Sequence, residues 1–120
     1  MIRELAVIAC FGALGAMARY GVGLWSTRLP LLQFPIGTLI VNVLGCFLMG
    51  VVVHLGLSAK LLPHWAFTGV SVGFLGAFTT YSAFGYQTLE HLEKYDFQIA
   101  FANVAANLVL GILAVWCGLA

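Results

Sequence analysis

Charged residues are scarce in this sequence. Only 8% of its 120 residues are charged, and 62% are hydrophobic. A soluble domain carries about 25% charged residues, which it needs to cover a surface that faces water. The composition therefore excludes a water-soluble fold and indicates an integral membrane protein. The net charge of +1 provides no basic patch for nucleic acid, so we expect membrane lipid to be the surrounding medium.

The sequence has only three cysteines. Cys10, Cys46 and Cys117 all stand inside apolar runs and form no Cys-x-x-Cys pair. Free cysteine behaves as a small hydrophobic side chain. The spacing therefore argues against a disulfide framework, a redox centre or a cysteine-bound metal.

Carboxylates are absent from the long middle of the chain. No Asp or Glu occurs between Arg28 and Leu89. A proton-coupled exporter, which is a rival class for a chain this short, needs a titratable carboxylate within the membrane. A carboxylate would also repel an anion, so its absence leaves an anion path open. A second rival is a non-conducting assembly subunit, which the composition does not exclude.

Long runs without formal charge, interrupted in the first case by Arg19, divide the chain into segments. A helix needs about 20 predominantly apolar residues to cross a bilayer. The period-2 alternation of a membrane barrel does not occur in the sequence. We therefore predict a single all-α integral membrane domain over residues 1–120, with four transmembrane helices at about 3–27, 34–57, 64–90 and 95–118.

Basic residues are shared equally between the two ends of the predicted helices. Arg3 and Lys60 fall on one side of the membrane, and Arg28 and Lys94 fall on the other. Orientation usually follows an excess of Lys and Arg on the cytoplasmic side. Two alternatives follow: the chain inserts in both orientations and pairs with an inverted copy, or other factors select one orientation. Four short transmembrane helices can scarcely enclose an aqueous path. We therefore expect an oligomer.

Polar residues at membrane depth are costly and usually face a partner, a cavity or a pathway. Thr38, Asn42 and Gly45 share one face of the second predicted helix, and Asn103 and Asn107 begin a similar stripe in the fourth. For Asn42 the alternatives are hydrogen bonding between helices and donation to a passing anion. The polar stripe of the fourth predicted helix either packs against a neighbouring helix or lines a water-filled pathway.

One charge lies well inside the first predicted helix. Arg19 shares a face with Gly12 and Gly15, whose small size permits close helix approach. Two roles are open for its guanidinium. It either snorkels to the membrane interface or draws anions toward a vestibule.

The third run contains the stretch GFLGAFTTYSAFG, from Gly73 to Gly85. Glycine costs a helix about 1 kcal/mol relative to alanine, and threonine hydroxyls compete for backbone partners. The stretch either remains helical with tightly packed glycines, or it breaks and frees carbonyl oxygens that need protein, water or an ion. Phe78, Tyr81 and Phe84 recur every three residues, either as core packing or as positive ring edges for an anion.

Three motifs resemble, in order and spacing, those of the CrcB, or Fluc, family of fluoride channels. They are GALGAMARY, FPIGTLIVNVLGCFLMG and GFLGAFTTYSAF, and the resemblance extends over essentially the whole chain. It implies an antiparallel, dual-topology homodimer in the cell (inner) membrane, with a broken third helix and a pair of fluoride pores. Such a channel exports fluoride passively, which reduces its toxicity in the cytoplasm, and it is not an enzyme.

The resemblance also implies site residues. A structural sodium ion at the dimer centre is held by the backbone carbonyls of Gly76 and Thr79 from each subunit. Tyr81, Ala83 and Gly85 depart from the family's commoner Phe, Thr and Ser, which leaves open which hydroxyls touch the ion. The residues that match the fluoride pathway by motif are Arg19, Thr38, Asn42, Thr80, Tyr81, Ser82 and Phe84. Asn103 and Asn107 are expected in the pathway as well, on the polar-track face of the fourth helix, where family residues vary.

Overall fold

The computed structural model of the protein describes residues 1–29 and 33–120. Within those ranges every regular element is helical, as the sequence predicts. The elements form an elongated bundle with extents of 48 × 28 × 23 Å. In chain order they are α1 (Ile2–Ser26), α2 (Ile36–Val53), η1 (His54–Ser58), α3 (His64–Thr68), η2 (Gly69–Leu75), α4 (Gly76–Phe78), α5 (Tyr81–Glu93) and α6 (Phe97–Leu119).

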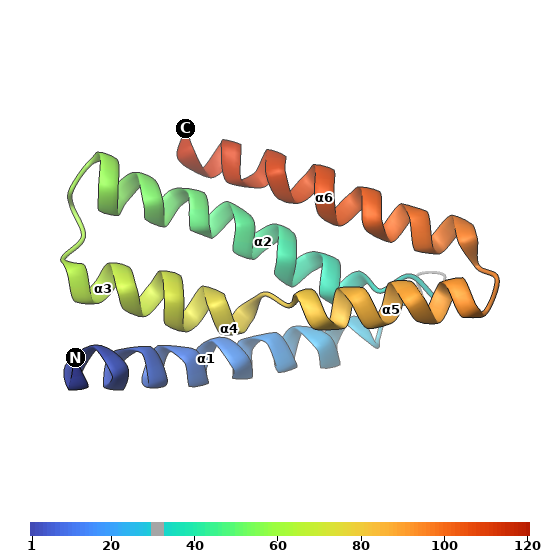
Figure 1. Ribbon diagram of the computed structural model, residues 1–120, viewed down its shortest axis with the longest axis horizontal. Helices are drawn as coiled ribbons and strands as arrows, with labels where there is room; N and C mark the ends of the chain where they lie inside the picture. The colour runs from blue at the N-terminus through green and yellow to red at the C-terminus, as the bar shows by residue number, and fades with distance from the viewer. Residues whose placement is uncertain (30–32) are drawn as a thin grey trace.

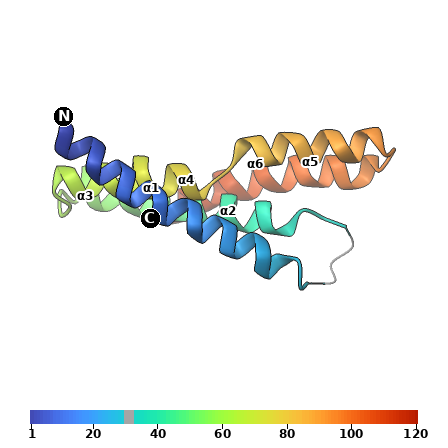
Figure 2. The same ribbon diagram turned by 90° about the horizontal axis from the view of Figure 1, so that it is seen from below.

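The helices lie side by side along the long axis of the molecule (Figure 1). α2 runs between α6 and the third run, which comprises α3, η2, α4 and α5. The two halves of that run have different neighbours. η2 and α4 pack on α1, whereas α5 packs on α6 at the far end of the bundle (Figure 2). A break between α4 and α5 therefore lies where the third run changes its packing partner.

Among the residues that the structure describes, three helices are long and apolar enough to cross a membrane. They are α1, α6 and the continuous helix over Ile36–Ser58 that α2 forms with η1. The third run, which the structure describes over its whole length, is divided at Thr79 and Thr80 and gives no fourth continuous span. Large apolar side chains are exposed on the outside of the bundle, where lipid covers them. The chain is a multi-pass membrane protein.

Glycines bring α1 close to the first half of the third run. A Cβ atom on Gly15 would overlap the backbone carbonyl of Phe74, and one on Gly73 would lie 2.9 Å from the carbonyl oxygen of Ile8. Small residues at a helix interface let two backbones approach in this way. Gly15 and Gly73 therefore serve close packing, which is one of the roles that the sequence leaves open for the glycine-rich faces.

Close glycine contacts also join α2 to α6. A Cβ atom on Gly50 would overlap the carbonyl oxygen of Val115, and one on Gly118 would overlap that of Phe47. Gly111 is buried farther along the same helix, α6. These contacts fix the distance between α2 and α6, and with it the distance between the asparagines that the two helices carry.

The third run breaks at two threonines. Thr79 has φ −82° and ψ 158°, and Thr80 has φ −148° and ψ 115°, so both residues are extended. Gly76, by contrast, is helical with φ −60° and ψ −36°. β-branched residues suit extended backbone, and glycine is required only where φ is positive. Of the two alternatives for this stretch the structure has the break, but only the threonines leave the helical conformation, and Gly76 takes no part in opening it.

The segment before the break, η2, is a π-helix rather than an α-helix. Within it, the Ser71 hydroxyl donates to the carbonyl oxygen of Phe67 at 2.7 Å. Such widened turns are rare and occur frequently at functional sites. The residue types do not predict this π-helix, because a widened turn depends on how the run packs against its neighbours.

Replacing Gly15 with alanine should destabilise the protein, because its Cβ has no room beside the Phe74 carbonyl. We expect the free energy of unfolding to fall by about 1–3 kcal/mol, as in forced overpacking. Unfolding in mild detergent, followed by circular dichroism, measures the loss. Gly21→Ala is the matched control, since nothing lies within 4 Å of its added Cβ. Equal stability of the two variants would contradict the close approach of α1.

Candidate functional site

The two threonines of the break cap the helices on either side of it. The hydroxyl and the amide of Thr79 donate to the Leu75 carbonyl oxygen at 3.0 and 3.1 Å. The Thr80 hydroxyl accepts a hydrogen bond from the Ala83 amide at 3.2 Å and thereby caps the N-terminus of α5. It also lies 3.2 Å from the Ser82 hydroxyl. Side chains thus replace part of the hydrogen bonding that the break removes.

Asn42 of α2 pairs with the backbone of Thr80. Its Oδ1 accepts a hydrogen bond from the Thr80 amide at 2.8 Å, and its Nδ2 donates to the Thr80 carbonyl oxygen at 3.1 Å. A primary amide offers one acceptor and one donor side by side, which matches what a peptide group needs. Unpaired backbone groups at membrane depth cost several kcal/mol each. The Asn42 side chain therefore stabilises the extended conformation of Thr80.

A chain of hydrogen bonds continues from Asn42 into α6. Asn42 Nδ2 also donates to Asn107 Oδ1 at 2.9 Å. Asn107 Nδ2 lies 2.9 Å from both the carbonyl oxygen and the Oδ1 of Asn103. Asn103 is fully buried and donates to the Thr88 hydroxyl at 3.0 Å, and Thr88 donates to the Phe84 carbonyl oxygen at 2.7 Å. We call this series, from Asn42 through Asn107 and Asn103 to Thr88, the amide chain.

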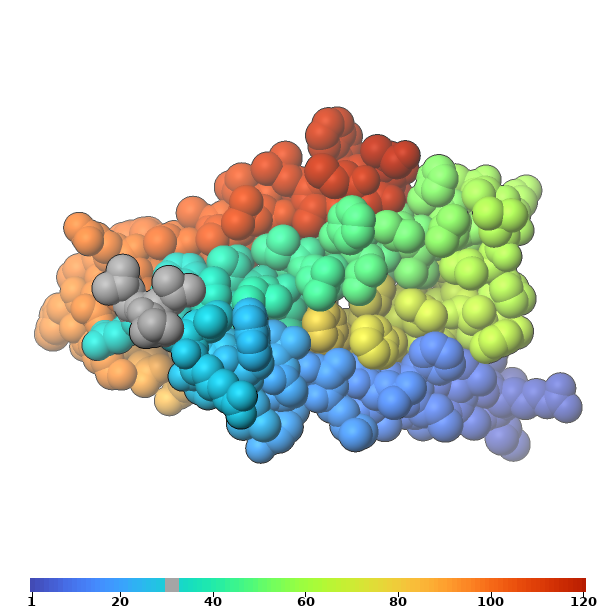
Figure 3. Space-filling model, turned by 180° about the vertical axis from the view of Figure 1, so that it is seen from behind, coloured from blue at the N-terminus to red at the C-terminus, as the bar shows by residue number. Residues whose placement is uncertain are grey.

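Arg19 of α1 approaches the break from the other side. Its Nε donates to the carbonyl oxygen of Ala77 at 3.0 Å, at the end of α4. A helix C-terminus carries a partial negative charge, which a guanidinium stabilises. Arg19 therefore caps a helix end, a role beyond the two that the sequence suggests. In the space-filling view the segment around the break, in yellow, is visible between α1 and α2 (Figure 3).

Two carbonyl oxygens at the break keep free lone pairs. Within the ranges 1–29 and 33–120, no hydrogen bond reaches the carbonyl oxygens of Gly76 and Thr79. In a continuous helix the Thr80 amide would bond to Gly76, but here it donates to Asn42. Gly76 is exposed, and an added Cβ would meet only the Ser71 carbonyl oxygen, at 3.9 Å. Both oxygens can therefore accept a group that the chain itself does not supply.

Several candidate pathway residues line one groove beside the break. This groove, which we call the break groove, has a volume of about 560 Å³, and Asn42, Thr80, Tyr81, Phe84 and Asn107 are among its lining residues. The ring centroids of Tyr81 and Phe84 are 5.6 Å apart, with an interplanar angle of 49°. Tyr81 is 83% exposed, so a single chain leaves the groove open on one side.

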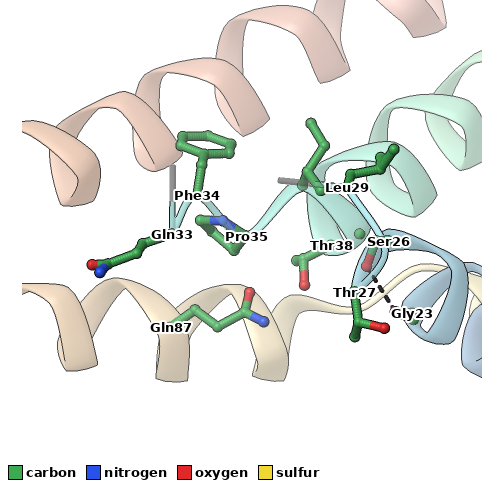
Figure 4. A pocket seen from close by; sticks show the side chains of 11 residues that line it. Gly23, Ser26, Thr27, Leu29, Gln33, Phe34, Pro35, Thr38 and Gln87 are labelled. Carbon is green, nitrogen blue, oxygen red and sulfur yellow. Dashed lines mark hydrogen bonds between the residues drawn. The ribbon is translucent and has the colours of Figure 1, made fainter. Parts of the chain in front are cut away.

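Thr38 and Arg19 line a second hollow. A cavity of about 330 Å³ has Arg19, Thr38 and Thr80 in its wall. It adjoins a cavity of about 650 Å³ that lies between the C-terminal part of α1, the start of α2 and Gln87 of α5, because Thr27 and Thr38 line both. Figure 4 shows hydroxyl and amide side chains from α1, α2 and α5 around the larger cavity. Together the two cavities extend from Gln87 of α5 to Thr80 of the break.

The structure does not place every candidate residue in a hollow. Ser82 is exposed and bonds to Thr80, and Asn103 is buried behind Asn107. Gln87 lines the larger cavity but is missing from the predicted set, and its Oε1 is buried without a hydrogen-bond partner among the described residues. In the helix predicted over residues 64–90, Gln87 stands seven residues after Thr80, and that helical spacing is the signal that could have identified it.

Comparison with known proteins identifies the family. Residues 6–119 match the family described as CrcB-like protein, Camphor Resistance (CrcB). The chain belongs to the CrcB family. It is 43% identical over 115 residues to the fluoride-specific ion channel FluC of Dehalococcoides mccartyi. These residues make up 96% of this chain and 88% of that protein.

Two further CrcB relatives show similar coverage. Fluoride-specific ion channel FluC 2 of Symbiobacterium thermophilum is 43% identical over 114 residues, which are 95% of this chain and 93% of that protein. Fluoride-specific ion channel FluC of Geobacter metallireducens is 40% identical over 115 residues, with 96% and 93% covered. The resemblance read from the three motifs is thereby confirmed, and the CrcB family is one of channels rather than enzymes.

Replacing Thr80 with valine should destabilise the protein, because valine keeps the extended backbone preference but cannot cap α5. We expect a loss of about 1 kcal/mol in the free energy of unfolding, as for other N-cap replacements. Thr80→Ser, which keeps the hydroxyl, should retain most of the stability in the same detergent unfolding experiment. If both variants lost the same stability, the hydroxyl cap would not be the cause.

Proposed function

We propose that the protein is a fluoride-specific ion channel that exports fluoride passively across the cell membrane. The observation that carries this proposal is the near full-length identity of 43% to a protein named as such a channel, joined to a break lined by hydrogen-bond donors. Passive export down a gradient would reduce fluoride toxicity in the cytoplasm, and it needs no titratable carboxylate.

The chemistry of fluoride fits the groups at the break. Fluoride is small and strongly hydrated, so a pathway must exchange its water for donors. The Asn42 amide, hydroxyls such as that of Thr80 and the positive ring edges of Tyr81 and Phe84 are such donors. Arg19 and Thr38 line the adjoining cavity and would attract the anion toward them. Ser82 remains in the proposed pathway on motif resemblance alone, and Asn103 remains in it on its place on the polar face of the fourth helix alone.

An antiparallel homodimer would complete the site. The break groove is open along one side of a single chain, and Tyr81 stands 83% exposed beside it. A second copy is a suitable cover, because the equal division of basic residues permits the inverted orientation. Two copies related by an axis in the membrane plane would then form a pair of pores, each with the same polar lining.

A structural sodium ion fits the carbonyl groups left open by the break. The backbone oxygens of Gly76 and Thr79 accept no hydrogen bond among the described residues. Carbonyls of unwound helix segments are suitable ligands for a monovalent cation. Gly76 and Thr79 of each subunit would hold the ion at the dimer centre, and the ion would neutralise the converging carbonyl dipoles.

Fluoride efflux from liposomes that hold the purified protein tests the function. We expect efflux without a proton gradient, and strong suppression by Asn42→Asp, which places a like charge in the path. Gln98→Glu is the control, because it makes the same chemical change at an exposed position of α6. Efflux that strictly requires counter-transported protons would favour a carrier, and no efflux would favour a structural role. Unchanged flux in Asn42→Asp would argue that Asn42 does not line the path.

Replacing Gly76 with leucine should disturb sodium binding and dimer assembly together. The fold of one chain has room for a larger side chain there, since the nearest atom to an added Cβ lies at 3.9 Å. Light scattering of the detergent-solubilised protein should show a shift from dimer to monomer, and Gly21→Leu should remain dimeric. A stable, sodium-binding dimer of the Gly76→Leu variant would contradict the proposed sodium site at the dimer centre. It would leave the proposed fluoride channel function unaffected.

A further inference from the structure

The amide chain fixes the orientation of each of its members. The Thr80 amide can only donate, so the Asn42 atom that faces it is Oδ1, and the Thr80 carbonyl then faces Nδ2. The remaining Nδ2 proton points to Asn107, which must present Oδ1. At its other end Asn107 meets the Asn103 carbonyl oxygen, which can only accept and therefore faces Nδ2. Backbone groups at both ends thus determine the amide orientations.

Both donors of Asn42 are consequently occupied within the chain. One donates to the Thr80 carbonyl oxygen at 3.1 Å and the other to Asn107 Oδ1 at 2.9 Å. An anion in the break groove can bind the Asn42 amide only by displacing one of these acceptors. The bond to the Thr80 carbonyl is one of the two hydrogen bonds between Asn42 and the Thr80 peptide groups that stabilise the break. The Asn107 bond is a single contact between two side chains that line the groove.

We propose that Asn107 is an internal competitor that occupies the Asn42 donor until fluoride displaces it. This inference rests on the proposed fluoride pathway. When no fluoride ion is present, Asn107 Oδ1 accepts the hydrogen bond from Asn42 Nδ2, so that the Asn42 amide is not left unpaired at membrane depth. Each fluoride ion must break that bond to gain its own, which keeps the ion's affinity low. A conducting site needs such shallow binding, because the ion must leave as readily as it enters.

Asn107 in this role is a positioning residue, since it acts on fluoride through Asn42. The competitor role predicts that removal of the Asn107 amide raises the affinity for fluoride, whereas structural damage to the site would lower it. If Asn107 bound fluoride directly, or if its loss merely disordered α6, affinity for fluoride would fall. If Asn107 competes, Asn107→Leu fills the same space without an acceptor, and the freed Asn42 donor binds fluoride more tightly. Asn107→Ala removes the acceptor and leaves open space, which covers the case in which leucine obstructs the ion.

Fluoride binding by ¹⁹F NMR, beside liposome efflux, tests the inference. We expect the fluoride dissociation constant to fall by about 5-fold in Asn107→Leu or Asn107→Ala, the equivalent of one net hydrogen bond. Maximal efflux should not rise. Thr88→Val is the matched control, because it breaks the far end of the amide chain and keeps the Asn42–Asn107 bond, so the constant should change by less than about 2-fold.

Weaker or unchanged fluoride binding in both Asn107 variants would overturn the competitor role. If neither variant folds, side-chain ¹⁵N resonances of the wild-type protein give the test. Saturating fluoride should shift the Nδ2 signals of both Asn42 and Asn107, and an unmoved Asn107 signal would also overturn the role. A wild-type protein that neither binds nor conducts fluoride would instead refute the proposed function, so the two failures are distinguishable.

Discussion

The pairing of the Asn42 amide with the Thr80 peptide group is the interaction on which the rest of the site depends. Its bonds of 2.8 and 3.1 Å supply the acceptor and donor that an extended residue loses inside a membrane helix. Without them the break would leave buried backbone groups unpaired, at a cost of about 1–3 kcal/mol each even in a protein interior. The hydroxyls of Thr79 and Thr80 and the guanidinium of Arg19 satisfy further groups around it.

The pairing also determines what the break leaves unsatisfied. Because the Thr80 amide turns to Asn42, the carbonyl oxygen of Gly76 has no helical partner. The carbonyl oxygen of Thr79 has none among the described residues because the Ala83 amide donates to the Thr80 hydroxyl instead. At the break the third run changes its packing partner from α1 to α6, and the break groove lies there, lined by residues of α2, the break, α5 and α6. Two helical hydrogen bonds are thus exchanged for bonds to the Asn42 amide and the Thr80 hydroxyl, and these exchanges leave the two carbonyls open beside the donor-lined groove.

The sequence predicts the broad architecture well, because charge-free runs of membrane length are a direct consequence of the lipid environment. From residue types alone the stretch from Gly73 to Gly85 could also have stayed helical, and it is the resemblance that implies a break there. The sequence does group Asn42 with Thr38, and Asn103 with Asn107, on shared helix faces. Periodicity cannot show that Asn42 bonds to a backbone group 38 residues away, since that contact depends on how α2 and the third run pack. The π-helical turn η2 and the unpaired Gln87 oxygen likewise arise from tertiary packing.

Solid-state NMR of the protein in lipid bilayers offers the most direct test that Asn42 holds the break. The ¹³Cα and ¹³Cβ shifts of Thr79 and Thr80 distinguish extended from helical backbone. In the wild-type protein both residues should show extended shifts, and in Asn42→Leu the Thr80 shifts should move toward helical values or become heterogeneous. Helical shifts in the wild type, or extended shifts that persist unchanged in Asn42→Leu, would contradict this role of Asn42.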